Sequence, residues 1–284
     1  MDSYTVLFGV IGDPIRHSKS PVMMNRAFEA LGINGSYGAF HVVPEKLGEA
    51  IKGIRALGFR GLNVTLPHKV NVMAHLDEIH PGALAAGAVN TIVNEQGRLI
   101  GYNTDGIGYV RSLKEEAASN LADSKIVVLG AGGAARGIVW ALAQEHPAEI
   151  IVANRTEEKA RELVATLSAE ANLTPIAWSQ LQTACQDADV VINTTSIGMA
   201  PNVDAVPLDV SWLKPGAVAS DLIYNPLKTK FLQQSDERGL VVHGGLGMFI
   251  YQGAYAFEYW TGQRAPVEVM VQAVLESFET SFSQ

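Results

Sequence analysis

The segment KIVVLGAGGAARGIVWALAQ, residues 125–144, joins an apolar run to a glycine turn and then to a helical pattern. Gly130, Gly132 and Ala135 stand at the spacing of a GxGxxA fingerprint, in which the first glycine permits a tight turn and the second lets the backbone approach a pyrophosphate. The helix N-terminus behind the turn offers free N–H groups and a partial positive charge to phosphate. This context favours a dinucleotide site over a glycine turn without a ligand. The expected contacts are Gly130, Ala131, Gly132, Gly133 and Ala134.

The end of the next expected strand indicates which dinucleotide binds. NAD sites usually place Asp or Glu there, about 20 residues after the turn, to hold the ribose 2′-hydroxyl. This chain has Asn154, Arg155 and Thr156 instead. A carboxylate would repel a 2′-phosphate, whereas the Arg155 guanidinium can pair with it in a forked geometry and Thr156 can add a hydroxyl donor. We therefore expect NADP as the cofactor, the alternative being that Arg155 is a solvated surface residue.

Strand and helix patterns alternate on both sides of this segment, which predicts an α/β fold with two domains. Strands are expected at 4–11, 36–43, 59–64 and 89–93, and again at 149–153, 173–177, 189–193, 217–222 and 240–243. Helices are expected at 21–31 and 44–57 and within 247–282. Because a polar stretch covers 115–124, we expect a first α/β domain over residues 1–110 and a Rossmann-type doubly wound domain over 120–246.

Composition excludes several classes of protein. The 284 residues are 48% hydrophobic and 18% charged, which provides enough apolar surface for well-packed cores. A net charge of -8 disfavours nucleic acid and anionic membranes as partners. Cys185 is the single cysteine and is expected to be a packing residue, so no intrachain disulfide can form. Without a basic leader or an apolar run of membrane-spanning length, a cytoplasmic protein is expected.

Polar residues of the first half gather after the expected strands, where open α/β sheets place their ligand sites. Ser18 and Ser20 follow the first strand, and Ser20 before Pro21 also fits a helix cap followed by proline. The other members of this group are Asn63, Thr65, Lys69, Asn90, Thr91 and 103–105. Taken singly, each residue is expected to be a cap or turn residue. The seven histidines show no zinc-ligand spacing, so we expect no metal site.

Taken together, several sequence segments of the chain resemble those of the shikimate dehydrogenase family. The similarity runs in order from Val10 to Gly262. It is carried by VIGDPIRHSKSPVMMNRAF, GLNVTLPHK, AGAVNT, GYNTDGIG, LGAGGAARG, NRTEEKA, INTTSIGM, DLIYNPLKT and GLGMFIYQGAYAFEYWTG. One departure is Met24, where many members of the family have histidine, and we expect it to lie behind the site. The resemblance implies NADPH-dependent reduction of 3-dehydroshikimate to shikimate, on the route to chorismate and the aromatic amino acids.

The resemblance also implies roles for particular residues. Lys69 and Asp105 match the catalytic pair of the family. Ser18, Ser20 and Tyr224 match residues that hold the substrate carboxylate, whereas Thr65, Asn90, Asp105 and Gln252 match residues that contact the ring hydroxyls. Ile223, Gly245 and Met248 match positions beside the nicotinamide. The helices of 247–284 are implied to pack back on the first domain, which would be the substrate-binding and catalytic domain.

Three alternatives stay open at this stage. A quinate/shikimate dehydrogenase with relaxed substrate or cofactor choice often uses NAD, against which the missing carboxylate at 154–156 argues. A non-catalytic NADP sensor is expected to lack Lys69 or Asp105, and both are present. A methylenetetrahydrofolate dehydrogenase shares the two-domain plan, but the serine pair and NTTSIGM favour the shikimate family. The sequence leaves monomer and homodimer equally open.

Overall fold

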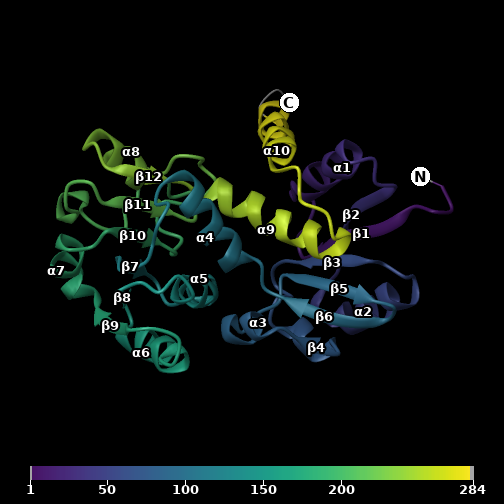
Figure 1. Ribbon diagram of the computed structural model, residues 1–284, viewed down its shortest axis with the longest axis horizontal. Coiled ribbons are helices and arrows are strands. Elements are labelled where there is room, and N and C mark those ends of the chain that lie inside the picture. Colours follow the sequence, from purple (N-terminus) through teal and green to yellow (C-terminus); the bar gives the residue numbers. More distant parts are fainter. Residues whose placement is uncertain (1, 282–284) are drawn as a thin grey trace. The chain divides into compact units, whose positions relative to one another are not determined.

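The computed structural model describes residues 2–281, which form two compact units (Figure 1). The first unit runs to Thr104 and resumes at Ile250, and the second is Asp105–Phe249. The expected end of the first domain at residue 110 is therefore wrong, because helix α4 (Asp105–Glu116) belongs to the second unit. A Cβ atom on Gly106 would lie 2.2 Å from the carbonyl oxygen of Gly137, so α4 lies directly against the helix that contains Gly137.

A six-stranded mixed sheet forms the first unit, in the order β2-β1-β3-β5-β6-β4. The strands are β1 (Val6–Gly12), β2 (Gly35–His41), β3 (Gly61–Val64), β4 (Glu78–Ile79), β5 (Thr91–Glu95) and β6 (Arg98–Tyr102). β1 pairs in parallel with β2 and β3, and β5 pairs antiparallel with β3 and β6. The four strands expected in this half are confirmed as β1, β2, β3 and β5.

Helices cover both faces of this sheet. α2 (Leu47–Ala56) and α3 (Pro81–Ala86) share one apolar core with the strands. On the other face lie α1 (Ser20–Ala30), the part of α9 (Gly245–Thr261) after Phe249, and α10 (Val267–Ser281). Trp260 packs on this face, where its ring centroid lies 5.4 Å from that of Phe8 and its Nε1 donates to the Ile92 carbonyl at 2.9 Å. The C-terminal helices thus return to the first unit; Phe282, the expected end of their segment, lies outside the described residues.

The second unit is built on a parallel sheet in the order β12-β11-β10-β7-β8-β9, a doubly wound arrangement. The strands are β7 (Lys125–Leu129), β8 (Glu149–Asn154), β9 (Leu173–Ala177), β10 (Val190–Asn193), β11 (Val218–Asp221) and β12 (Val241–His243). Its helices besides α4 are α5 (Gly133–Ala143), α6 (Glu157–Leu167), α7 (Leu181–Gln186) and α8 (Lys230–Glu237). α7 and α8 share one core with the sheet, and this core contains Cys185, as expected of a packing residue.

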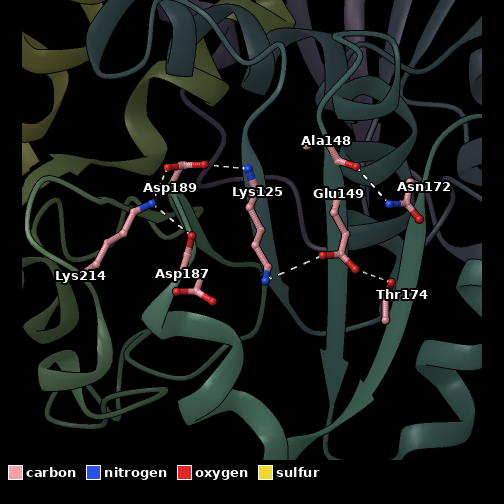
Figure 2. Close-up of polar contacts among 8 residues, drawn as sticks. All are labelled: Lys125, Ala148, Glu149, Asn172, Thr174, Asp187, Asp189 and Lys214. Atoms are coloured by element: carbon pink, nitrogen blue, oxygen red, sulfur yellow. Dashed lines mark hydrogen bonds and ion pairs between the residues drawn. The ribbon is translucent and has the colours of Figure 1, made fainter.

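Hydrogen bonds and ion pairs of charged residues connect the strands of the second unit where β7, β8 and β10 begin (Figure 2). The Lys125 backbone N–H donates to Asp189 at 2.8 Å, and Lys125 Nζ lies 3.9 Å from Glu149 Oε2. Lys214 Nζ lies 2.6 Å from Asp189 Oδ1. Partial burial opposes ionisation of Asp189, but these hydrogen bonds outweigh it and lower its pKa. The charges lie at the amino ends of the strands, and the glycine turn follows the carboxyl end of β7.

Candidate active site

A buried hydrogen-bond network begins at Ser20 in the first unit. The Ser20 side chain bonds to the Tyr37 hydroxyl, which in turn donates to Asn63 Oδ1 at 2.7 Å. Asn63 Nδ2 donates to Thr91 Oγ1 at 3.1 Å and to the Asn90 carbonyl at 3.2 Å. Because Tyr37 is buried, desolvation raises the pKa of its hydroxyl well above the usual value, and it remains a neutral donor.

The network continues from Asn90 to Thr104, the last residue of the first unit before the chain enters the second. Asn90 Oδ1 accepts the Thr104 backbone N–H at 2.8 Å and the Thr91 hydroxyl at 3.1 Å, while Asn90 Nδ2 donates to Thr104 Oγ1 at 3.0 Å. Asn90 is 3% exposed and Thr104 is 0% exposed. The side chain of Asn90 therefore fixes the backbone immediately before Asp105.

The serine pair lies where β1 leads into α1. Ser20 is the first residue of α1, and the N-cap residue is Lys19, whose side chain makes no capping bond. The alternative in which Ser20 caps this helix is thus wrong, because its hydroxyl is engaged with Tyr37. Ser18 Oγ accepts the Ser20 N–H at 3.3 Å, which holds the two serines in one turn. Ser18 is partly exposed and Ser20 is buried.

Thr65 and Lys69 lie in the tight loop after β3. The His68 N–H donates to the Thr65 carbonyl at 3.0 Å, and the Val89 N–H donates to the Lys69 carbonyl at 2.8 Å. His68 is completely buried, and its Nε2 lies 2.6 Å from the Val42 carbonyl, so Nε2 carries the proton. Its Nδ1 has no protein partner. The loop that carries Lys69 is therefore held from within by the ring of the neighbouring residue.

Asp105 is the first residue of α4, in the second unit. Its carboxylate stands in the first turn of a twelve-residue helix, where the helix dipole favours a negative charge. Gly106 allows the close approach of α4 to α5 described above, and Lys114 on the same helix pairs with Glu145 at 2.6 Å. The position of Asp105 is thus set by its helix, which packs against the helix behind the glycine turn.

The glycine turn joins β7 to α5 and leaves part of its backbone open. Gly130 has φ of +107°, in the region that favours glycine, and a Cβ there would lie 2.7 Å from Thr194 Oγ1. Gly132 and Gly133 are exposed, and nothing lies within 4 Å of a Cβ added to either. α5 begins at Gly133, and Ala135 is buried in the packing behind the turn. Exposed Ala134 and partly exposed Ala131 complete a turn whose backbone a pyrophosphate can approach.

The residues at the end of β8 are open to solvent. Arg155 and Thr156 are exposed, and Asn154 Nδ2 donates to the Thr156 carbonyl at 2.8 Å, which shapes the connection to α6. Glu157 and Glu158 occupy the first turn of α6, and Glu157 pairs with Arg161 one turn further on. The predicted 2′-phosphate group contacts therefore stand at the carboxyl end of β8, beside the strand that leads into the glycine turn.

A buried carboxylate organises the loop after β11, which carries Ile223 and Tyr224. Asp221 is 0% exposed and accepts from the Ile223 N–H at 3.1 Å, the Thr229 hydroxyl at 2.8 Å and Asn193 Nδ2 at 3.2 Å. Burial raises the pKa of Asp221 to about 6 in spite of these three donors. Ile223 is buried, whereas the exposed Tyr224 ring stacks on Phe249 with centroids 5.5 Å apart.

The remaining predicted contacts lie on α9. Gly245 and Met248 fall in its first turn, in the second unit, and a Cβ on Gly245 would lie 2.1 Å from the Leu222 carbonyl oxygen. Gln252 is partly exposed in the first unit. Met24 is completely buried and its Cε would lie 3.2 Å from a Cβ on Gly253, so it packs against α9.

The structure gathers Ser20 and Asn90 in one unit and the glycine turn, Arg155, Ile223 and Asp105 in the other. Sequence reasoning did not assign roles to Tyr37, Thr104 and Asp221, which hold the predicted residues in place. The available signal was position for two of them, since Thr104 precedes Asp105 and Asp221 ends β11, whereas Tyr37 lies inside β2 and carries no such signal. Among residues 2–281 no group of three His, Cys, Asp or Glu side chains could hold a metal ion. The same residues contain no helix that is long and apolar enough to cross a membrane.

Three family models, each for a different part of the chain, and several solved structures match it. Residues 10–92 match the shikimate dehydrogenase substrate binding domain, residues 112–200 match shikimate / quinate 5-dehydrogenase, and residues 245–275 match the shikimate 5′-dehydrogenase C-terminal domain. The shikimate dehydrogenase (NADP(+)) of Bacillus cereus strain B4264 is 50% identical over 270 residues, which cover 95% of this chain and 98% of the relative.

Solved structures match over the same extent. A shikimate dehydrogenase in complex with NADP+ has a TM-score of 0.89 and 42% identity, with 98% of this chain and 97% of that chain covered. The shikimate 5-dehydrogenase of Listeria monocytogenes, in complex with shikimate and NAD, has a TM-score of 0.91 and 37% identity, with coverage of 96% and 97%. Sequence and structure thus point to the same relatives along nearly the whole chain.

Proposed function

This chain belongs to the shikimate dehydrogenase family, and from that premise we propose that it interconverts 3-dehydroshikimate and shikimate with NADP(H), using Lys69 and Asp105 as its catalytic pair. It is an oxidoreductase that takes NADP as its cofactor. The reaction is the step of chorismate biosynthesis in which a ring ketone becomes a hydroxyl. The first unit is the proposed substrate-binding domain and the second is the proposed cofactor domain.

The observation that carries this proposal is the buried network from Ser20 to Thr104. A ring that bears a carboxylate and several hydroxyls needs donors and acceptors held in fixed directions, because each unpaired polar group in a closed site costs binding energy. Ser20 and Asn90 meet this need, since Tyr37 holds the first and Thr104 the second. Ser18 and Tyr224 are assigned to the carboxylate, and Thr65 and Gln252 to the ring hydroxyls.

Lys69 is assigned the proton transfer. Reduction of a ketone adds hydride to carbon and leaves negative charge on oxygen, which needs a proton donor in the transition state. Bound NADPH supplies the hydride. The Lys69 ammonium donates its proton to the ketone oxygen in this direction, and the neutral amine takes it back from the hydroxyl in the other.

The residues around the glycine turn fit NADP. The open backbone of Gly132 and Gly133 at the start of α5 suits a pyrophosphate, and Arg155 with Thr156 suits the 2′-phosphate. Ile223, Gly245 and Met248 are assigned to the nicotinamide end. The Listeria relative was crystallised with NAD, so NAD is the cofactor to compare with NADP in the assay.

The test is to follow nicotinamide absorbance while the purified protein is mixed with shikimate or quinate and with NADP or NAD. Rapid reduction of NADP with shikimate is the expected result, with much slower turnover for the other three pairs. Preference for NAD or quinate would move the chain to the quinate/shikimate branch. NADP binding without turnover of either substrate would overturn the assignment and favour a sensor.

Location and partners stay predictions. We expect a cytoplasmic enzyme that acts on free small molecules, without nucleic-acid or membrane partners, in keeping with the net charge of -8. We also expect a monomer or a homodimer, and light scattering coupled to size-exclusion chromatography distinguishes the two.

A further inference from the structure

A chain of hydrogen bonds leaves α4, crosses the strands β11 and β12, and returns to α4. It starts at Tyr109 on α4, whose hydroxyl lies 2.7 Å from Ser220 Oγ on β11. Ser220 Oγ lies 2.8 Å from His243 Nδ1 on β12, and His243 Nε2 lies 2.7 Å from Ser112 Oγ, back on α4. Tyr109 and Ser112 are three residues apart and so share one face of the helix. We call these four residues the α4 clamp.

The clamp has only one consistent direction of donation. Ser112 Oγ donates to Glu116 Oε1 at 2.9 Å, so it must accept from His243, and Nε2 of the imidazole carries the proton. His243 Nδ1 is then an acceptor, so Ser220 donates to it and accepts from the Tyr109 hydroxyl. Each group thus donates one bond, and none competes with its neighbour. Such a chain specifies a single arrangement of its members.

All four members are buried, so water cannot replace a lost bond. Tyr109, Ser112 and Ser220 are 0% exposed and His243 is 1% exposed. Burial lowers the pKa of His243 to about 4, which keeps the ring neutral at pH 7 and preserves its Nδ1 as an acceptor. Ser220 and His243 are also direct partners in the register of β11 with β12. The clamp therefore locks α4 onto two strands that are already paired.

The clamp adjoins the predicted nicotinamide contacts. A Cβ on Gly247 would lie 1.9 Å from Ser112 Oγ and 2.4 Å from Glu116 Oε1, so the first turn of α9 rests on the clamp. That turn carries Gly245 and Met248, and β11 leads into the loop of Ile223. The other end of α4 begins with Asp105. The clamp thus joins α4, the helix that begins with Asp105, to β11, β12 and the first turn of α9.

We propose that the α4 clamp is a positioning device of the reaction, in which His243 and Ser112 fix the helix of Asp105 relative to the strands and turn that hold the nicotinamide. This inference rests on the proposed function, because it assigns the clamp to the same reaction. None of the four side chains is assigned to touch substrate or cofactor. They act through Asp105, whose displacement by a fraction of an ångström weakens both its hydrogen bond to the ring and the chemical step.

The decisive variant is Ser112→Ala, and Ser235→Ala is its matched control. Ser235 is also 0% exposed in the second unit, but it lies on α8 and its hydroxyl donates only to the Phe231 carbonyl at 2.8 Å. Both variants remove one buried hydroxyl, so both should lower the unfolding temperature by a few degrees. We expect Ser112→Ala to lower kcat and raise the shikimate Kd, each by about fivefold to tenfold, and Ser235→Ala to change neither.

A double-mutant cycle with Asp105→Asn separates positioning from general weakening. The shikimate Kd, measured by calorimetry without cofactor, does not depend on turnover. If the clamp acts through Asp105, then adding Ser112→Ala to Asp105→Asn should leave this Kd within about twofold. A loss of the same size in both backgrounds, or an equal loss in Ser235→Ala, overturns the proposal.

Failure of the proposed function is distinguished from failure of the clamp. If the wild-type protein does not turn over shikimate, the assignment of the reaction fails, whatever the variants do. The clamp itself is then judged by hydrogen exchange, which needs no substrate. Faster exchange of the α4 amides in Ser112→Ala than in Ser235→Ala supports it, and equal exchange in the two variants refutes it.

Discussion

The two units present their predicted ligand groups in opposite ways. In the first unit they include buried side chains that bond to other side chains, such as Ser20 and Asn90, which are 8% and 3% exposed. In the second unit they are backbone groups of an open turn, where nothing lies within 4 Å of a Cβ on Gly132 or Gly133, together with the exposed Arg155. Substrate recognition should therefore depend on internal structure, and cofactor recognition on local surface shape and charge.

The largest effect is expected from Lys69→Met, which separates the chemistry of the first unit from binding by the second. General acid–base catalysis contributes about 10²- to 10⁴-fold, so kcat should fall by that factor. The NADP Kd, measured by nicotinamide fluorescence, should stay within about twofold because the glycine turn is intact. Lys52→Met, which replaces an exposed lysine of α2, is the control. A Lys69→Met enzyme within tenfold of wild type in kcat is incompatible with the assigned role.

Next in size is Asn90→Ala, which tests whether ligand groups of the first unit also support its structure. The Thr104 N–H would lose its acceptor, so unfolding free energy should fall by about 1 to 3 kcal/mol. The shikimate KM should rise on the order of 100-fold because a ring contact is lost as well. Asn94→Ala removes another buried amide of the same sheet, which donates to the Phe59 carbonyl at 2.7 Å. That control should lose stability and keep its KM.

Arg155→Ala makes the opposite prediction for the second unit. Loss of a charge-assisted pair should raise the KM for NADP by about 10- to 100-fold, since such bonds contribute about 1.5 to 3 kcal/mol. The unfolding temperature should not change, because the side chain is exposed. Arg161→Ala, at another exposed arginine that pairs with Glu157, should leave the KM unaltered. If Arg155→Ala destabilised the fold as much as Asn90→Ala, the contrast between the units would be lost.

The smallest effect is expected at Asp221. This side chain is buried, unlike the exposed cofactor contacts of the second unit. Its folded-state pKa of about 6 exceeds the ordinary 3.8, so the native protein binds more protons than the unfolded chain between these values. Its carboxyl therefore makes the protein less stable as pH rises from about 4 to 6. Asp221→Asn should flatten this part of the curve in urea unfolding, and an unchanged slope would contradict the assignment.

Local patterns predicted the strands and the glycine turn because their causes lie within a few residues. An apolar run beside Gly130 is sufficient to indicate a strand and its turn. The network around Asn90 could not be predicted from local patterns, since Tyr37 and Thr104 join it only after the sheet has formed. The domain boundary was misplaced for the same reason. Nothing in the local sequence of α4 indicates which unit it belongs to. The helix packs in the second unit through the close approach of Gly106 to Gly137.

The family residues could be predicted only through resemblance. A serine before a proline is a cap in most sequences, and only the joint occurrence of the segments indicated a carboxylate site. The structure adds what resemblance does not contain, namely that Tyr37 engages the Ser20 hydroxyl. The α4 clamp could not be predicted from local patterns or from the resemblance, because its members come from three elements that are distant in the sequence. Tyr109 and Ser220 are 111 residues apart, and Ser112 and His243 are 131 residues apart.

The charged groups where β7, β8 and β10 begin give the two ends of the sheet in the second unit different roles (Figure 2). Lys125 bonds to Asp189 on one side and faces Glu149 on the other, so the strands are held at one end by groups that contact no proposed ligand. Loops at the opposite end are then free to be exchanged. A protein engineer who wishes to change cofactor or substrate choice can therefore rebuild the loops at the carboxyl ends and leave the amino ends of the strands untouched.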